Sequence, residues 1–593
     1  METIRDATFA QILRWVTGNK VFLYPEELPG FVVPEAYLNS DAAVPVNEED
    51  STPPERRSLS PSTSEKRENR PDEPNGDVDG DIEASRVSSR THTATFSQER
   101  LQLDEEATLE RRTSSSIAPQ RTKEGLILVD WYTTDDPANP QNWSSKKKGL
   151  TALQICLYTF VIYTGSSIYV PAEGQIMERF GVQQTKASLG LALYVVAYGL
   201  GPLIWSPLSE VPVFGRNIPY ITTFFLFVIL SLPTALVENF AGLLVLRFLQ
   251  GFFGSPCLAA GGASMQDMYN LLVLPMLLTA WVASAYCGPA LGPLLSSFAV
   301  TAKNWRWALW EILWMAGPVF VVMFFCLPET SADNILLRRA KRLRKLTGNP
   351  KIHSQTEIDR KGIKFSSILV DALIKPIEIM IKDPAVLFTN VYTSLVYGIY
   401  YSFFEVFPLV YPPIYGFNLG LTGTAFVCII VACILGAAIY IAYLKFYLIP
   451  DILKNGLRAQ ESRLVPALFA VFGPVIGLFL FGWTARASIH WIVSIIGIVI
   501  YAGTAFIIFQ CIFVYIPLSY PQYAASLFAG NDFSRSAFAF GAILFSRPMY
   551  LNLGVDKGIT LLAGLSVLGV IGMFVLYFYG ANLRARSRFA VSG

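Results

Sequence analysis

Long apolar runs alternate with short polar connections from about residue 150 to residue 580. An α-helix rises about 1.5 Å per residue, so roughly 20 apolar residues cross the hydrocarbon core of a bilayer, which is about 30 Å thick. Runs of this length are expected at 150–170, 187–206, 218–237, 240–262, 273–299, 305–327, 386–411, 423–447, 464–485, 489–516, 524–546 and 557–580. The pattern predicts an all-α membrane protein with twelve transmembrane helices.

Polar stretches divide the chain into five expected parts. These are a cytoplasmic N-terminal tail at 1–145, an N-terminal six-helix half at 146–327, a cytoplasmic central loop at 328–385, a C-terminal six-helix half at 386–582 and a cytoplasmic C-terminal tail at 583–593. Two six-helix halves joined by a long loop are typical of secondary transporters built from repeats.

The N-terminal tail is expected to be largely disordered. Residues 40–125 are dense in Ser, Thr, Pro and charged residues, and such a segment buries too little apolar surface to offset its ordering entropy. Residues 1–23 differ, because apolar side chains fall near helical spacing at Ile4, Phe9, Ile12, Leu13 and Val16. We expect either a short amphipathic helix, lying on the membrane or on the transporter body, or a partly ordered tail.

Basic residues set the expected topology. If there are twelve spans, the clusters fall on one side: Lys146, Lys147, Lys148, Arg216, Arg338, Arg339, Lys341, Arg342, Arg344, Lys345, Lys445, Lys454, Arg458, Arg463, Arg584, Arg586 and Arg588. The positive-inside rule then makes both termini cytoplasmic. The sequon at Asn142 lies on that side, so no N-glycan is expected.

Composition excludes several other classes. Only 16% of the residues are charged and the net charge is +2, so nothing indicates nucleic-acid binding. The seven cysteines lie in apolar runs without CxxC pairs and the three histidines are scattered, so we expect no metal site. Nucleotide-binding and hydrolase motifs are absent from the sequence. We therefore expect no enzyme and no cofactor, and an ion gradient as the energy source.

The connection after the second run reads GPLIWSPLSEVPVFGRN, residues 201–217. Gly215 permits a tight turn beside Glu210 and Arg216, so this charged turn is expected to bridge neighbouring helix ends and form a cytoplasmic gate. The segment resembles the second-to-third loop of the major facilitator superfamily.

An arginine interrupts the fourth run, LLVLRFLQGFFG. On a helix, Arg247, Gln250, Gly251 and Gly254 share one face, and the glycines allow close helix packing. Arginine does not lose its proton, so Arg247 is expected to be a fixed charge that tunes a nearby acid in the transport path. The alternative is that it snorkels to the outer interface.

The fifth run contains AYCGPALGPLLSSF. Gly288 and Gly292, with Pro289 and Pro293, predict a kinked and closely packed helix. This resembles the motif that marks proton-driven exporters of the superfamily, although Ser296–Ser297 stand where a glycine pair is often found.

Three further stretches sharpen the resemblance: DPANPQNWSSKKKG at 136–149, NWRWALWEILWMAG at 304–317 and YGIYYSFFEVFPLVYPPIYGF at 397–417. They are similar to the twelve-span fungal drug:proton antiporters of the fluconazole- and benomyl-resistance type, over residues 135–590. The resemblance implies efflux of bulky hydrophobic drugs, such as azole antifungals and cycloheximide-like compounds, across the plasma membrane in exchange for protons.

Other functions stay open at this point. One alternative is an exporter of an endogenous secondary metabolite, a toxin or polyamines, and a more remote one is a transporter-like nutrient sensor. The expected partners are small hydrophobic substrates, protons and the lipid bilayer, with no nucleic acid, and we expect a monomer.

Acidic residues within or near the spans are candidates for proton coupling. Asp532 and Arg535 have the spacing of a helix ion pair, which favours a structural role. Glu405 lies among aromatic residues and is the best titratable candidate. Asp267 is expected to anchor the cytoplasmic gate.

The resemblance also implies a substrate cavity lined by the first, fourth, seventh and tenth spans. The matching candidates, besides Arg247, Gln250 and Glu405, are Gln154, Tyr158, Tyr163, Tyr397, Tyr401 and Gln510. An aromatic cavity with few polar groups favours bulky compounds and loose specificity. The alternative for any single tyrosine is helix packing.

Overall fold

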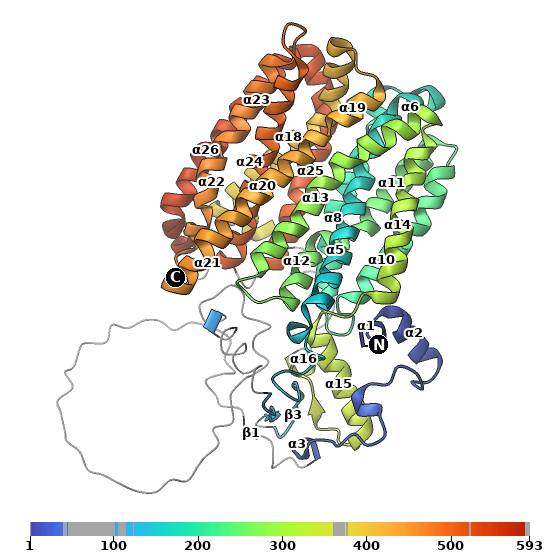
Figure 1. Ribbon diagram of the computed structural model, residues 1–593, viewed down its shortest axis with the longest axis vertical. Coiled ribbons are helices and arrows are strands. Elements are labelled where there is room, and N and C mark those ends of the chain that lie inside the picture. The colour runs from blue at the N-terminus through green and yellow to red at the C-terminus, as the bar shows by residue number, and fades with distance from the viewer. Residues whose placement is uncertain are drawn as a thin grey trace, which may run out of the picture.

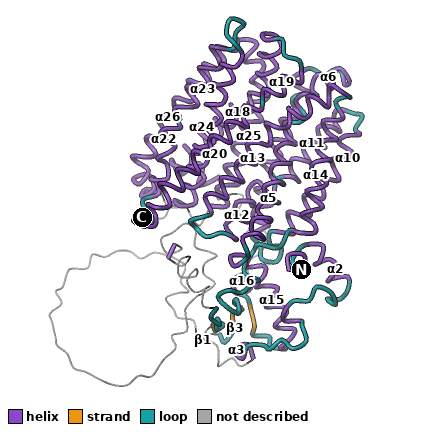
Figure 2. The backbone as a smooth tube through the Cα atoms, viewed as in Figure 1, coloured by secondary structure: helices purple, strands orange, loops and turns teal. Residues whose placement is uncertain are grey.

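Two helical bundles lie side by side in the computed structural model, with smaller N-terminal elements gathered at one end of the first bundle (Figure 1). The structure describes residues 2–38, 44–45, 101–102, 104, 114–122, 124–359, 374, 377–520 and 524–587. Helices dominate these residues, and the backbone trace shows strands only outside the bundles (Figure 2).

The first bundle is the N-terminal half. Its helices are α5 (Ser145–Ser167), η6 (Val170–Ala172), α6 (Glu173–Phe180), α7 (Gln184–Ala187), α8 (Leu189–Leu200), α9 (Pro202–Ser209), α10 (Asn217–Leu236), α11 (Phe240–Gly254), α12 (Pro256–Met268), α13 (Leu274–Ala302) and α14 (Arg306–Cys326).

The second bundle is the C-terminal half. Its helices are α18 (Pro384–Tyr415), α19 (Leu419–Ala425), α20 (Val427–Tyr443), η7 (Leu444–Leu448), α21 (Ile449–Asn455), η8 (Gln460–Leu464), α22 (Val465–Ala470), α23 (Phe472–Thr484), α24 (Trp491–Ser519), α25 (Ala524–Leu553) and α26 (Val555–Arg586).

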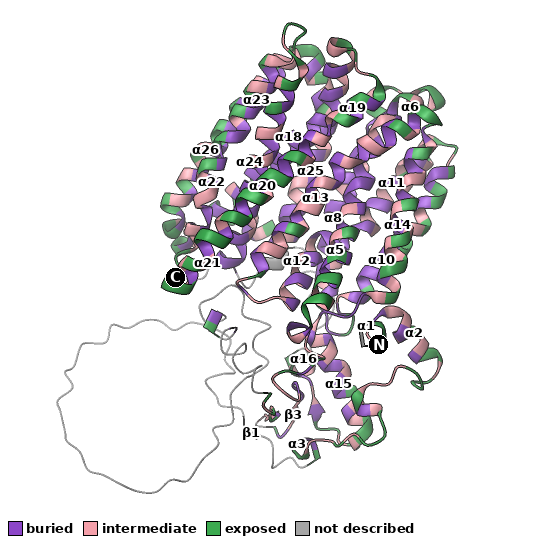
Figure 3. Ribbon diagram, in the orientation of Figure 1, coloured by how far each residue is buried: buried purple, intermediate pink, exposed green. Residues whose placement is uncertain are grey.

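Ten helical segments in the described part of the chain are long and apolar enough to cross a membrane. They account for every predicted span except 386–411 and 524–546, where α18 and α25 lie within the C-terminal bundle (Figure 1). Exposed positions gather on the outward faces of the bundles, and they include many large apolar side chains (Figure 3). Apolar outward faces suit a lipid environment, so the chain is a multi-pass membrane protein.

The Gly-Pro helix α13 packs on α5 through its small residues. A Cβ atom at Gly288 would lie 2.8 Å from the Phe160 carbonyl oxygen, and one at Gly292 would lie 2.7 Å from the Ile168 backbone nitrogen. Pro293 has no N–H for the Pro289 carbonyl, and Ser167 Oγ donates to that oxygen at 2.7 Å instead. The predicted close packing is therefore confirmed.

The two serines at the end of this motif do not take over the role of glycines. Ser296 Oγ and Ser297 Oγ donate to carbonyl oxygens of their own helix, those of Gly292 and Pro293. The close approach is supplied from the other half, because Gly423 of α19 lies against Ser297.

A small folded unit, which we call the loop module, lies at one end of the N-terminal half. It contains α1 (Glu2–Arg5), α2 (Thr8–Val16), η1 (Pro25–Glu27), α3 (Glu35–Leu38), η5 (Pro140–Asn142), α15 (Ala332–Thr347), α16 (Gln355–Asp359) and a sheet of β1 (Val44–Pro45), β2 (Gln120–Arg121), β3 (Ile127–Leu128) and β4 (Ile352–His353). Neighbouring strands pair in the order β1-β2-β3-β4, with β2 and β3 antiparallel and the other pairs parallel.

The loop module corrects two predictions. Residues 114–122, expected to be disordered, are ordered, and β2 within them pairs with β3 through Arg121 and Ile127. Residues 1–145 and 328–385 are not separate parts, because β3 and β4 join them. An apolar core supports the joint structure and includes Trp131 and Leu343. The predicted disorder of residues 46–100 lies outside the described residues.

Buried charges hold the loop module together. Arg339 binds Asp136 at 2.7 Å and Glu26 at 3.3 Å, and Arg342 binds Glu26 at 3.0 Å. Burial alone would raise the pKa of Glu26, but Arg342 and Arg339 beside it bring that pKa below its usual value. The pairing therefore compensates the cost of burying these groups.

Replacing Gly292 by Val should destabilise the protein, because the new side chain meets backbone atoms of α5. Overpacking of this kind costs about 1–3 kcal/mol. Thermal unfolding of the purified protein in detergent measures the loss. Gly317→Val on α14 is the matched control, since a Cβ atom there meets nothing within 4 Å. Equal unfolding temperatures for the two variants would contradict the packing argument.

Candidate functional site

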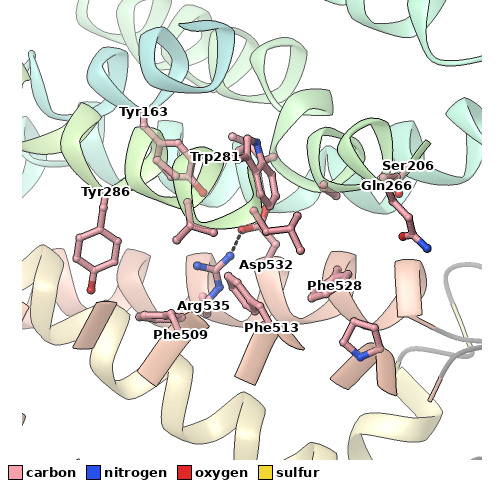
Figure 4. Close-up of a pocket in the computed structure, with 18 of the residues that line it drawn as sticks. Tyr163, Ser206, Gln266, Trp281, Tyr286, Phe509, Phe513, Phe528, Asp532 and Arg535 are labelled. Atoms are coloured by element: carbon pink, nitrogen blue, oxygen red, sulfur yellow. Dashed lines mark hydrogen bonds and ion pairs between the residues drawn. The ribbon is translucent and has the colours of Figure 1, made fainter. Parts of the chain in front are cut away.

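A central pocket lies between the two halves (Figure 4). It encloses about 1170 Å³ of empty space, counted with its open mouth. The lining reaches from Tyr286 to Gln266 and Pro517, which lie near the ends of α12 and α24. These helix ends lie on the side of the bundle that carries α15, which we call the α15 end, so the pocket extends toward that end (Figure 1).

Aromatic side chains from both halves contribute to the pocket wall. They come from α5 and α13 on one side and from α18, α24 and α25 on the other: Tyr163, Trp281, Tyr286, Tyr397, Phe509, Phe513 and Phe528. Aromatic faces stack on planar compounds of many shapes, so such a wall favours bulky apolar guests.

One ion pair stands in this aromatic wall. Arg535 donates to Asp532 at 2.6 Å, and the side chain of Asp532 is buried while that of Arg535 is 11% exposed. The guanidinium lies over the rings of Tyr397 at 4.9 Å and of Phe509 and Phe513 at 5.5 Å. The predicted ion pair is therefore confirmed. Asp532 Oδ2 and Arg535 Nε have no hydrogen-bond partner among the described residues, so both atoms remain available to bind a guest.

Hydroxyl groups join the two halves beyond the pocket. Tyr198 of α8 bonds to Tyr397 and, at 2.9 Å, to Tyr401 of α18, and Ser166 of α5 lies 3.3 Å from the Tyr401 hydroxyl. We call these four side chains the hydroxyl chain. Because it links α5 and α8 to α18, it closes the pocket on the side away from α15.

Two buried carboxyl groups meet farther along the same side. Ser188 Oγ lies 3.0 Å from Glu405 Oε1 and 3.2 Å from Glu173 Oε2, and Gln184 donates to Glu173 at 2.5 Å. A hydroxyl has one hydrogen to donate. With a proton on one carboxyl, Ser188 could donate to one group and accept from the other, so the two carboxyl groups of the different halves meet through this serine.

The surroundings of the carboxyl pair hold one cation and few other charges. Arg547 of α25 acts electrostatically on both Glu173 and Glu405. No arginine or lysine lies within ion-pair distance of either carboxyl in the described part of the chain. The pair thus has no cation in direct contact that would fix both groups as carboxylates.

The structure corrects the expectation for Arg247. Its guanidinium is fully buried and donates to three carbonyl oxygens, those of Gly165 at 2.8 Å, Ser166 at 2.9 Å and Gly190 at 3.1 Å. It also lies 4.3 Å from the centroid of the Tyr194 ring. Among the described residues no carboxyl pairs with it, so it ties α11 to α5 and α8 rather than tuning an acid.

The rest of that helix face packs in the same way. A Cβ atom at Gly251 would lie 2.3 Å from the Tyr194 carbonyl oxygen, and Gln250 Nε2 donates to Ser231 Oγ at 3.0 Å. Gln250 Oε1 is buried without a hydrogen-bond partner in the described chain. Neither residue lines the central pocket, because both face neighbouring helices of the N-terminal half.

The predicted gate residues come together at the α15 end. Gly215 adopts a φ of 67°, which favours glycine, and Arg216 reaches Asp267 at 3.3 Å. The backbone N–H groups of Arg216 and Asn217 donate to Glu329 at 2.9 and 3.1 Å. The charged turn is thus held by α12 and by the start of the central loop.

The position of Arg216 also fixes its charge. Burial would lower the pKa of Arg216, but Asp267 and then Glu210 raise it above its usual value. Glu210 itself is exposed.

Two of the six predicted cavity residues, Tyr163 and Tyr397, line the central pocket. Tyr401 instead belongs to the hydroxyl chain. Gln154, Tyr158 and Gln510 are buried away from the pocket, which corrects their assignment. The ring of Tyr158 packs on aromatic residues of α10, and Gln154 Nε2 binds a carbonyl oxygen of its own helix.

The sequence analysis did not identify several residues of the site. Trp281 and Phe513 lie in continuous apolar runs, where nothing distinguishes a pocket face from a lipid face. Glu173 follows the first predicted span and has the character of a loop charge. Glu329 is 113 residues from Arg216, so only the fold brings them together.

A pocket between two six-helix halves that extends toward one end defines a membrane transporter. The profile of the Major Facilitator Superfamily matches residues 155–536. The chain belongs to this superfamily.

Curated relatives support the assignment over most of the chain. An MFS-type transporter pyvG of Aspergillus violaceofuscus is 48% identical over 80% of this chain and 87% of its own. Fluconazole resistance protein 1 of Saccharomyces cerevisiae is 41% identical over 80% and 87%. The cycloheximide resistance protein of Candida maltosa is 37% identical over 99% of both chains.

Solved structures share the fold at low sequence identity. The MFS proton:xylose symporter XylE has a TM-score of 0.53 at 12% identity and covers 73% of this chain and 97% of its own. The human organic anion transporter MFSD10 has a TM-score of 0.51 at 14% identity and covers 72% and 99%.

Charge in the central pocket should discriminate between guests. In Asp532→Asn the guanidinium of Arg535 loses its counter-charge, so a planar cation should bind about tenfold more weakly, while an uncharged azole changes less than threefold. Quenching of tryptophan fluorescence in the purified protein measures binding, and Trp281→Phe identifies the signal from the pocket. Ser534→Ala on the same helix is the control, and equal affinities for the cation would contradict the assignment.

Proposed function

We propose that this protein exports bulky, largely apolar compounds across the plasma membrane in exchange for protons, with both termini in the cytoplasm. The basic clusters of the loop module support that orientation, because it places the α15 end inside. The energy source is the proton gradient, with no cofactor. The two halves of one chain complete the pocket, which supports a monomer as the working unit.

The central pocket is the observation that carries the proposal. Its aromatic wall contains a single ion pair, Asp532 with Arg535, so it offers stacking surface and very few directional contacts. Such a site accepts many planar compounds and discriminates weakly among them. Relatives named for resistance to fluconazole and to cycloheximide support azoles and cycloheximide-like compounds as substrates.

The carboxyl pair is our proposed coupling site. A proton taken up from outside lets Glu173 and Glu405 share Ser188, which holds the outer end closed while the pocket extends inward. Loss of that proton to the cytoplasm leaves two carboxylates facing each other, and their repulsion favours separation of the halves. A compound bound in the pocket at that stage is released outside. Each cycle therefore exchanges a compound that leaves the cell for a proton that enters it, as in an antiporter.

Arg247, Gln250 and Gly251 contribute indirectly in this scheme. They fix α11 against α5 and α8, the helices that carry Ser166 and Tyr198 of the hydroxyl chain. The gate residues Gly215, Arg216 and Asp267 fix the other end of the same half. The N-terminal half can then move as a rigid unit against the C-terminal half.

Expression in a yeast strain that lacks its own drug exporters tests the function. Cells that carry the protein should grow at several-fold higher concentrations of fluconazole and cycloheximide and accumulate less labelled drug. A protonophore should abolish the difference, because export depends on the gradient. Resistance that persists in de-energised cells would contradict proton antiport.

Variants of the carboxyl pair test the coupling. Glu405→Gln and Glu173→Gln keep the hydrogen-bonding shape but cannot release a proton, so drug efflux should fall at least tenfold and become nearly independent of external pH. Binding of drug to the purified protein should change less than threefold. Glu178→Gln on the same helix α6 is the matched control, since Glu178 is exposed. A wild-type pH profile in both variants would rule out this pair.

A further inference from the structure

The N-terminal helix α2 lies against the N-terminal half at the α15 end. The ring of Phe9 packs on Phe325 at the end of α14, with ring centroids 4.6 Å apart. Thr8 Oγ1 donates to Asn217 Oδ1 at 2.8 Å, at the first residue of α10. The helix is therefore fixed at the level where the membrane spans begin.

A cavity separates α2 from α10 and α15. It contains about 570 Å³ of empty space with its open mouth, and its lining combines apolar side chains, those of Ile12, Trp15 and Ile218, with polar ones. The lining residues are Asp6, Thr8, Gln11, Ile12, Trp15, Asn217, Ile218 and Arg338.

Arg338 is the important cation of this wall. Its neighbours Arg339 and Arg342 on α15 pair with carboxylates, whereas Arg338 forms no hydrogen bond or ion pair with any described residue. Asp6, the acid in the same wall, is 3.4 Å from Arg5 and accepts a bond from Tyr24. Arg338 thus offers a half-buried positive charge to an anion from outside the chain.

The apolar part of the cavity lining continues onto a membrane-facing surface. Trp15 is 82% exposed and Ile12 46% exposed on α2. Ile218 is the second residue of α10, whose exposed Phe225 and Leu226 follow toward the bilayer. Tryptophan at this level and an amphipathic helix beside it are typical of the lipid–water interface.

We propose that this cavity binds an anionic phospholipid of the cytoplasmic leaflet. The phosphate contacts the guanidinium of Arg338, and an acyl chain descends along Ile218 and the outer face of α10. Basic pockets at the cytoplasmic surface recognise anionic headgroups in this way. The apolar part of the lining distinguishes a lipid from a free phosphate, and the assignment uses the orientation given under the proposed function.

A bound lipid would stabilise the gate turn at Gly215 and Arg216 as well as the helix α2. Thr8 contacts Asn217, and the backbone N–H of Asn217 shares Glu329 with that of Arg216. Asn217 thus connects the lipid cavity to the gate turn, so lipid binding is expected to stabilise that turn.

Lipid binding to the purified full-length protein tests the proposal. Native mass spectrometry in detergent counts bound dioleoylphosphatidylserine and dioleoylphosphatidylcholine. Wild type should bind phosphatidylserine at least fivefold more tightly. Arg338→Gln should lose this preference and Arg338→Lys should retain part of it, while Trp15→Ala should weaken binding of both lipids.

Controls separate this result from charge, misfolding and loss of transport. Lys345→Gln removes the same charge from an exposed site on α15 and should keep the preference. An unchanged preference in Arg338→Gln would overturn the proposal, as would equal protection from thermal unfolding by soluble glycerophosphate and by phosphatidylserine. Drug binding in the central pocket is measured in parallel. Loss of drug binding with an intact lipid preference would count against the proposed function and not against the lipid site.

Discussion

A polar group buried inside a membrane bundle finds no water, so every such group needs a partner within the protein. This constraint explains where the charges of this chain lie. Arg247 is held by three carbonyl oxygens, and the carbonyl that Pro293 leaves unpaired is taken by Ser167. Two sets of buried polar groups in the transport path are not fully paired. Asp532 and Arg535 keep free atoms in the pocket wall, and two carboxyl groups depend on one serine hydroxyl.

The polar contacts are distributed unevenly between the two ends. In the described part of the chain, the hydrogen bonds between side chains of the two halves join Ser166, Ser188 and Tyr198 to α18. The gate at the α15 end instead binds one half to the central loop. Opening that end breaks none of these inter-half bonds, which agrees with a pocket that extends toward it. The opposite end opens only when hydroxyl and carboxyl contacts separate together.

Periodicity and charge predicted the fold well, because helix length and loop charge are local properties. The position of Asp267 at the gate also followed, since Asp267 and Arg216 flank apolar runs on the same side, although the pair that they form was not predicted. The residues of the pocket wall could not be predicted from the sequence. Tyr158 and Tyr163 lie on one helix, and its rotation against α10 and α13 decides which of them faces the pocket. The partner of Glu405 was equally hidden, because Glu173 comes from the other half and a different helix.

The hydroxyl chain has a consequence for substrate range. Ser166 donates its one hydrogen to the Tyr163 carbonyl oxygen at 2.7 Å, so it accepts from Tyr401, and the donors run from Tyr397 through Tyr198 and Tyr401 to Ser166. Tyr397 is the member of the chain that lines the pocket, and its hydrogen is directed to Tyr198, so its oxygen is left to accept from a guest whose edge carries a donor such as an amine. The hydroxyl chain thus gives this part of the pocket wall one hydrogen-bond polarity, which suits a guest that carries a donor better than one that carries only acceptors.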